Sequence, residues 1–416
     1  MKPSSFYNIK IYFIILCAFY AFLPSGCVEK QVEAITRENL FTLQIGRLED
    51  QIAFYNQDGG GGGGGLCMSE GIFYISDTEG QKVTRFNSYG DILTMIYNDE
   101  TNPQPLTLKP KLDGESVTRW AFTYPFQKPG RIAIDTQKHI YVEDLIPNER
   151  RGFDPESKAL LDSVALHFDA DGRFLEYLGQ EGIGGSPFPR IEGLYASVND
   201  DLAVVCRLPT GWNIYWFDTD GVLLYLIKIK NGSVPIPTDR KDVVFASLDS
   251  IAAAPDARKL YIKVDYYRDT FDDSTNTRTG NESDSSVIWV MRVEDGIYEK
   301  NIETPLYESA YMENNRKVVI KIPYTLLGIA EDERVFLYFP EESGYALLIL
   351  DTRESNGVQH QGSVSVDMNE LQFNAFHLSR EGILSAMLIS DWDVKLVWWR
   401  TDKFFEDDEW QDFGFR

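Results

Sequence analysis

The sequence is poor in the residues that build covalent and metal-based sites. Its 416 residues include 4 Cys and 4 His. Four cysteines are too few for a disulfide scaffold in a chain of this length. The histidines are scattered, and the sequence contains neither a His-Glu-x-x-His zinc motif nor a G-x-S-x-G nucleophile motif. We therefore predict no catalytic residue, no metal ligand and no cofactor from the sequence.

Positive charge is also scarce. The chain has 40 Lys+Arg against 64 Asp+Glu, a formal net charge of −24. This charge would repel a phosphate backbone, which argues against a nucleic-acid partner. The chain is 43% hydrophobic and 13% aromatic, so it can bury enough apolar surface to exclude intrinsic disorder. Its length allows two or three domains, or one large all-β domain.

Long apolar runs are absent except near the start, at residues 11–23. That run is too short for a membrane span, which needs about 20 residues, but it suits a signal peptide. It ends in Leu23-Pro24-Ser25-Gly26-Cys27, which resembles a bacterial lipobox with Pro24 in place of the usual Leu. We predict a signal peptide at 1–26, lipidation of Cys27, a tether at 27–39 and a cell-envelope location. An ordinary secretory signal with a chance Cys, or an uncleaved anchor, are the alternatives.

A β-unit recurs six times after this segment. In each copy a polar turn leads into a β-prone second strand, and a third strand follows. The second strands start at Phe73, Ile140, Leu202, Leu260, Val335 and Ile383. The third strands start at Val83, Val164, Asn213, Val287, Tyr345 and Val394. We predict an all-β fold over residues 40–405, a six-bladed β-propeller of four-stranded antiparallel blades. Residues 40–46 would supply the outer strand of the last blade, because an open ring would expose a strand edge. Residues 406–416 would form an acidic tail.

The unit at residues 72–93 resembles an NHL repeat, with the Asp77-Thr78 pair at the end of a strand. The match is partial in the second and third units, and only the strand pattern remains in the last three. The whole chain is similar to spirochaete propeller lipoproteins of unknown function. The resemblance implies a lipid-anchored propeller and assigns no activity.

The insertions are predicted to share one face of the propeller. Two lie between second and third strands, at 145–162 and 268–286, and three join consecutive blades, at 47–65, 99–128 and 232–247. In an up-down blade these two kinds of connection emerge on the same side. The polar insertion 268–286 is expected to be a mobile loop. The insertion 99–128 carries four aromatic residues that would form a partner-contact loop or pack against the blade below: Trp120, Phe122, Tyr124 and Phe126.

Three remaining signals have structural explanations. The glycine run 59–65 lacks the strand and helix of a phosphate-binding loop, so we expect a flexible connector. The Asp-x-Asp-Gly segments 169–172 and 218–221 lack the further ligands of a calcium loop, so we expect hairpin turns. Cys67 and Cys206 fall on different predicted strands, and two buried thiols are favoured over a disulfide.

Two functions remain open. The leading hypothesis is a monomeric, non-catalytic binding or scaffold module that contacts a protein or envelope component through the loop-rich face and the membrane through its lipid. The alternative is a metal-dependent, lactonase-like hydrolase that binds calcium at the central pore mouth. Acidic residues at predicted strand ends would serve that enzyme, or would simply be solvated: Asp77, Asp135, Glu143 and Asp144.

Overall fold

The computed structural model describes residues 33–54, 64–110, 118–237, 245–272, 274–313, 316–353 and 358–405. The predicted signal peptide 1–26, the lipidation site Cys27, most of the glycine run and the tail 406–416 lie outside these residues. Residues 34–416 belong to one compact unit. Among the described residues, no helix has the length and hydrophobicity needed to cross a membrane.

The described residues form an all-β propeller of six sheets with four to six strands each and two separate hairpins. The first sheet holds β4 (Gly65–Ser69), β5 (Ile72–Asp77), β6 (Lys82–Phe86), β7 (Ile92–Tyr97), β9 (Trp120–Thr123) and β8 (Lys109–Pro110). The second holds β10 (Ile132–Ile134), β11 (Ile140–Leu145), β14 (Ser163–Phe168), β15 (Phe174–Gly179) and β16 (Gly182–Ile183). The third holds β17 (Ile191–Ala196), β18 (Leu202–Leu208), β19 (Gly211–Phe217) and β20 (Leu223–Lys230).

The fourth sheet holds β21 (Phe245–Ala253), β22 (Lys259–Phe271), β23 (Arg278–Arg292) and β24 (Tyr298–Thr304). The fifth holds β27 (Thr325–Ala330), β28 (Arg334–Glu341), β29 (Gly344–Asp351), β30 (Val358–Ser365) and β1 (Glu33–Ile35). The sixth holds β31 (Phe373–Leu378), β32 (Leu384–Ile389), β33 (Asp393–Trp399), β2 (Arg37–Ile45) and β3 (Gln51–Ile52). The hairpins are β12 (Gly152–Asp154) with β13 (Ala159–Leu161), and β25 (Leu306–Glu313) with β26 (Arg316–Pro323). Two short 3-10 helices, η1 (Asn148–Arg150) and η2 (Thr401–Phe405), complete the structure.

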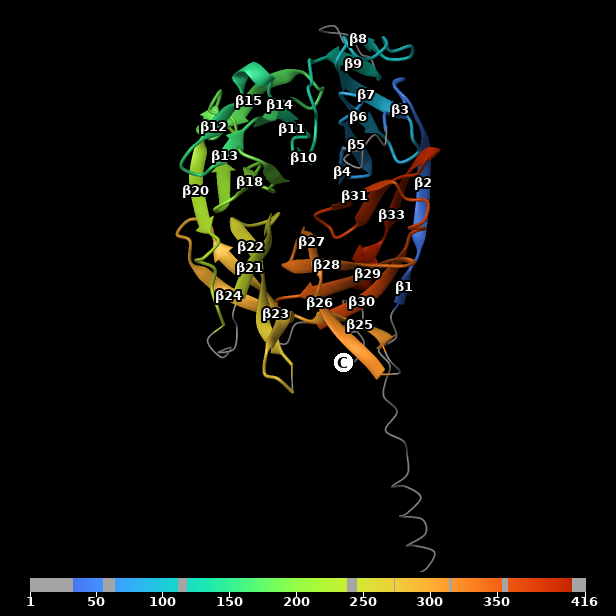
Figure 1. The fold of residues 1–416 in the computed structure, drawn as a ribbon. Helices are drawn as coiled ribbons and strands as arrows, with labels where there is room; N and C mark the ends of the chain where they lie inside the picture. Colours follow the sequence, from blue (N-terminus) through green and yellow to red (C-terminus); the bar gives the residue numbers. More distant parts are fainter. Residues whose placement is uncertain are drawn as a thin grey trace, which may run out of the picture. The chain divides into compact units, whose positions relative to one another are not determined.

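The sheets follow one another around a ring (Figure 1). The first strand of each sheet faces the centre, and we call β4, β10, β17, β21, β27 and β31 the inner strands. Each inner strand contacts the inner strand of the next sheet, and β31 contacts β4, so the contacts run around the whole ring. The predicted second and third strands all form within these sheets. Alternating and continuous runs of Val, Ile, Tyr and Phe therefore located the strands correctly.

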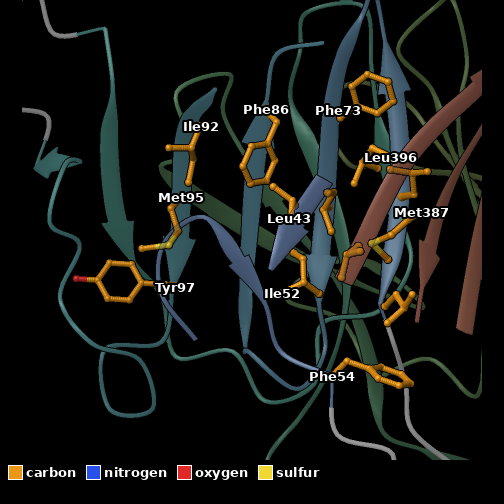
Figure 2. Close-up of a cluster of buried hydrophobic side chains, with 14 of the residues drawn as sticks. Leu43, Ile52, Phe54, Phe73, Phe86, Ile92, Met95, Tyr97, Met387 and Leu396 are labelled. Atoms are coloured by element: carbon orange, nitrogen blue, oxygen red, sulfur yellow. The ribbon is translucent and has the colours of Figure 1, made fainter. Parts of the chain in front are cut away.

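The core lies between neighbouring sheets, because each sheet is covered on both faces. The cluster between the sixth and first sheets shows this arrangement (Figure 2). Leu43 and Met387 of the sixth sheet lie in one buried cluster with Phe73, Phe86 and Met95 of the first. Phe73, Phe86 and Met387 are almost completely buried. Two-sided burial explains why the middle strands have apolar residues at nearly every position.

The ends of the chain meet in the sixth sheet. β2 pairs antiparallel with β33, with Arg37 opposite Trp399 and Leu43 opposite Val394. The predicted pairing of residues 40–46 with the last sheet is therefore confirmed. The first strands, β1 and β2, start before residue 40, so residues 33–39 do not belong to a tether as we predicted. The β-prone apolar pattern begins at Leu40, whereas the backbone pairing of β1 and β2 extends into the charged residues 33–39 before it.

The two faces of the ring differ in their connections. We call one the short-turn face, because the turns from first to second strand and from third to fourth strand lie there and span only a few residues. The connections from second to third strand and from sheet to sheet emerge on the opposite, loop-rich face. η1, both hairpins and the strands β8 and β9 all lie in those connections.

The insertions are more ordered than the sequence suggests. The insertion 268–286, predicted as a mobile loop, is mostly strand, because β22 and β23 pair from Lys259 opposite Arg292 to Phe271 opposite Arg278. Ion pairs from Arg268 to Glu282 (2.6 Å) and from Arg278 to Asp269 (2.7 Å) link the two strands. Cross-strand charge pairs therefore replace the apolar alternation that the prediction required. The hairpin β25–β26 was not predicted at all, although its two β-prone runs flank an Asn-Asn pair.

Candidate functional site

A cavity of about 630 Å³ occupies the centre of the ring. Residues from all six inner strands line it. Each inner strand pairs with a second strand on one side only, so its other edge has no ladder partner in the described sheets. Backbone groups therefore form much of the wall. The volume is within the range of sites that hold small molecules, 300–1,000 Å³.

Charged side chains gather at the end of the cavity nearest the loop-rich face. Arg131, which precedes β10, contacts Glu143 of β11 at 3.2 Å and Glu192 of β17 at 2.9 Å. Glu192 also contacts Arg190 at 3.0 Å. Burial raises the pKa of Glu143 in spite of Arg131 beside it. These residues link the second and third sheets, and their charges largely offset one another.

The end nearest the short-turn face is also ionic. Lys138 contacts Glu70 at 2.8 Å and donates a hydrogen bond to the hydroxyl of Ser69 at 3.2 Å. Arg380 donates to the backbone carbonyl of Ser197 at 3.3 Å. Hydrogen bonding to Lys138 lowers the pKa of Glu70. Both ends of the cavity are therefore polar, and the side chains between them are mainly apolar.

His377 of β31 also lines the cavity. Its Nδ1 accepts a hydrogen bond from the backbone N–H of Met68 on β4, at 3.1 Å. Burial lowers the pKa of His377 to about 4. The ring is therefore neutral near pH 7, and because Nδ1 accepts, Nε2 carries the hydrogen. The sequence offered no signal for His377, Arg131 or Glu192, since their proximity depends on how the sheets are arranged.

Two of the four predicted pore-mouth carboxylates hold the backbone in place. Asp77 is completely buried and accepts hydrogen bonds from the N–H groups of Ala53 (2.8 Å) and Gly80 (2.7 Å). Burial raises the pKa of Asp77 to about 6. Asp144 accepts hydrogen bonds from the N–H groups of residues 127 and 128, and burial raises its pKa to about 7. Neither carboxylate lines the cavity.

The other two carboxylates also lie apart from each other. Asp135 is buried, accepts a hydrogen bond from the N–H of His139 at 2.8 Å and contacts its Nδ1 at 3.2 Å. Of these four carboxylates, only Glu143 lines the cavity. Of the four acids that would serve a pore-mouth enzyme, three therefore bond to the backbone of their own surroundings and do not line the cavity. A carboxylate at the end of a strand can point into the cavity or into a neighbouring turn, and the sequence does not distinguish these two directions.

The four aromatic residues of the insertion 99–128 pack between the first and second sheets. Trp120 and Phe126 are buried, and Trp120 donates a hydrogen bond to the carbonyl of Asp171 at 2.5 Å. The Tyr124 ring lies 5.2 Å from that of Phe168, centre to centre. Arg173 lies over the ring of Phe122 at 5.6 Å. These contacts agree with the packing alternative, while Phe122 and Tyr124 remain partly exposed.

The remaining sequence signals have the expected structural roles. Asp169 and Asp218 each accept hydrogen bonds from backbone N–H groups inside their own turns, as hairpin turns require. Cys67 and Cys206 are buried free thiols. Within the described ranges, no group of three or more His, Cys, Asp or Glu side chains has an arrangement that could hold a metal ion.

Comparison with known proteins adds distant structural similarity. No protein-family model matches the sequence, and no curated protein sequence matches it. A polysaccharide lyase structure is 10% identical, with a TM-score of 0.41, over 88% of this chain and 99% of that one. Virginiamycin B lyase from Staphylococcus aureus is 12% identical, with a TM-score of 0.39, over 87% and 99%. A gluconolactonase from Xanthomonas campestris is 11% identical, with a TM-score of 0.38, over 88% and 97%.

Proposed function

We propose that this protein is a lipid-anchored, six-bladed β-propeller of a bacterial cell envelope that binds a protein or envelope component without catalysis. The observation that carries the proposal is the asymmetry of the ring. The insertions that hold η1, both hairpins, β8 and β9 lie on the loop-rich face, whereas the chain enters the propeller from the other face. Each blade in this proposal corresponds to one of the six sheets around the cavity.

The direction of β2 supports this orientation. Arg37 lies opposite Trp399, at the end of β33 on the short-turn face, and Gln44 lies opposite Asp393 near the loop-rich face. Nine residues separate Cys27 from Arg37, and a fully extended chain covers at most about 3.5 Å per residue. A lipid on Cys27 would therefore hold the short-turn face nearer the membrane. The loop-rich face would point away from the membrane, toward a partner.

The shorter tether changes how the body is held. A tether over residues 27–39 would let the acidic propeller stand away from anionic headgroups. With strands starting at Glu33, about five residues remain between Cys27 and the folded body. Such a tether spans at most about 20 Å. The body would therefore stay close to the bilayer, held by its acyl chains against electrostatic repulsion.

No observation favours the hydrolase over the binding module. A catalytic calcium site needs several oxygen ligands in one place. Glu143 is the one predicted acid that lines the cavity, and its carboxylate contacts Arg131. Calcium-dependent lactone hydrolysis by the purified protein is the outcome that would overturn the proposal in favour of the enzyme.

Site-specific photo-crosslinking in intact cells tests the binding face. A photoreactive phenylalanine would replace Phe271, which is 52% exposed at the end of β22. The matched control is Tyr89, which is 86% exposed in the turn 87–91 on the short-turn face. We expect a discrete protein adduct from position 271 and none from position 89. An adduct from position 89 alone would refute the assignment of the binding face.

The anchor has its own test. Cys27→Ala should abolish incorporation of radiolabelled palmitate and move the protein from the detergent phase to the aqueous phase. If the variant stays in the detergent phase, Cys27 is not the anchor.

A further inference from the structure

The hairpin β25–β26 has one face that is open to solvent. Opposite residues of an antiparallel pair lie on the same face, and the register pairs Lys317 with Met312, Val319 with Ala310, and Lys321 with Glu308. All six side chains are exposed. Met312 is 68% exposed and Val319 is 46% exposed. We call these six residues the hairpin face.

The opposite side of the hairpin contacts the propeller near Tyr307, whereas Tyr311 and Ile320 farther along that side are exposed. The Tyr307 ring stacks on that of Phe339 of β28, with centres 4.0 Å apart. The Tyr307 hydroxyl donates a hydrogen bond to Glu341 at 2.7 Å. β26 also lies against β23 of the fourth sheet, although no ladder joins these two strands. The hairpin (orange in Figure 1) is therefore held in a defined position.

The hairpin face combines apolar and basic chemistry. Met312, Ala310 and Val319 form an apolar strip, and Lys317 and Lys321 flank it. Lys321 contacts Glu308 at 3.5 Å, so two positive charges stand against one negative charge. This positive excess is local, because the chain as a whole has a net charge of −24. A two-stranded hairpin is also marginally stable in water unless something covers it.

We propose that the hairpin face binds an acidic, apolar polypeptide segment of a partner protein. The two lysines would pair with carboxylates of that segment, and its apolar side chains would cover Met312 and Val319. An anionic membrane would offer similar chemistry. The hairpin lies on the loop-rich face, however, away from the side where the chain enters the propeller. The choice of a protein over a lipid as the occupant therefore rests on the proposed function. The chemistry proposed for the hairpin face rests on its own residues.

Binding of a synthetic peptide to the full-length protein in detergent micelles tests the chemistry. The probe is a fluorescent twelve-residue peptide of alternating Glu and Leu, and its control has Lys at each Glu position. We expect saturable binding of the Glu peptide that weakens as salt is added, and no binding of the Lys peptide. Lys317→Glu combined with Lys321→Glu should weaken binding about tenfold or more, since each exposed pair contributes modestly and both reverse sign.

A matched control uses two other lysines. Lys228 and Lys230 are exposed on the outer strand β20. Lys228→Glu combined with Lys230→Glu changes the net charge by the same amount and should leave peptide binding unchanged. Met312→Ser combined with Val319→Ser should also weaken the peptide, without a change in the salt dependence.

Four results would overturn the proposal. Equal effects of the two lysine pairs would mean that only net charge matters. Binding to phosphatidylglycerol vesicles that the Lys317 and Lys321 substitutions abolish would make a lipid surface the occupant. Self-association that the same variant abolishes in sedimentation would make it a second copy of the chain. Tighter peptide binding after deletion of residues 406–416 would make the acidic tail the occupant. None of these results depends on whether Cys27 is lipidated.

Discussion

Replacing Asp77 tests the structural role that its contacts assign to it. The side chain is completely buried and accepts backbone hydrogen bonds from Ala53 (2.8 Å) and Gly80 (2.7 Å). Lys82, opposite Asp77 in the ladder between β5 and β6, is also completely buried. Its Nζ donates a hydrogen bond to the carbonyl of Leu48 at 2.6 Å. Asp77 therefore holds the segment after β3 against the first sheet, and its carboxylate lies near the buried ammonium group of Lys82.

The expected cost of Asp77→Ala follows from these contacts. Each buried N–H that loses its acceptor costs about 1–3 kcal/mol, and an uncompensated buried charge adds to this. Two lost acceptors beside the buried charge of Lys82 together give about 3–5 kcal/mol. We expect the free energy of unfolding to fall by that amount. Asp77→Asn keeps one acceptor oxygen and should cost less.

The assay is urea unfolding of the full chain, followed by tryptophan fluorescence and far-UV circular dichroism together. Asp218→Ala is the matched control. Asp218 also accepts two backbone N–H groups, from residues 220 and 222, but in an exposed turn where water can replace it. We expect a loss of about 1 kcal/mol or less there. Equal losses for Asp77→Ala and Asp218→Ala would refute the assigned role.

Three further predictions concern the cavity, the core and the closing strand. The pKa of His377 falls from 6.5 to about 4 on folding, so stability should fall as pH drops below 6.5, by about 3 kcal/mol near pH 4 at about 1.4 kcal/mol per pH unit. His377→Asn should remove this part of the pH dependence, and an unchanged acid profile would contradict it. Phe126→Ala should cost about 3–5 kcal/mol in urea unfolding, whereas Trp392→Ser, at an 86% exposed position, should cost little. Leu43→Ala should cost about 2–5 kcal/mol, and a neutral result would show that β2 adds nothing to the sixth sheet.

The sequence predicted the strands well because strand formation is a local property. The runs that start at Phe73, Val164 and Tyr345 all lie in strands that begin within one residue of those positions. Pairing between the chain ends was also predictable, since an unpaired last sheet would expose an edge. The ribbon 268–286 was misjudged because charge pairs such as Arg268 with Glu282 stabilise it, and these do not follow the apolar alternation of a strand.

The candidate site was much less predictable. Asp77 and Asp144 are carboxylates at strand ends, as pore-mouth ligands would be, yet their oxygens accept hydrogen bonds from nearby backbone N–H groups. Arg131 and His377 line the cavity because separate sheets bring them to the centre. Trp120 and Phe126 looked like a contact surface but fill the space between two sheets. Side-chain direction depends on how neighbouring sheets pack, and one strand's sequence does not determine that packing.

The join between the two chain ends has a consequence for the order of folding. Trp398 donates a hydrogen bond to Glu38 at 2.9 Å across 360 residues of chain. β2 can pair with β33 only after nearly the whole chain has been made, and contacts this far apart in sequence form slowly. During synthesis the growing chain exposes an unpaired strand that can associate with other chains. Loss of β2 or of β33 would produce the same defect, a complete set of other sheets around a ring that cannot close.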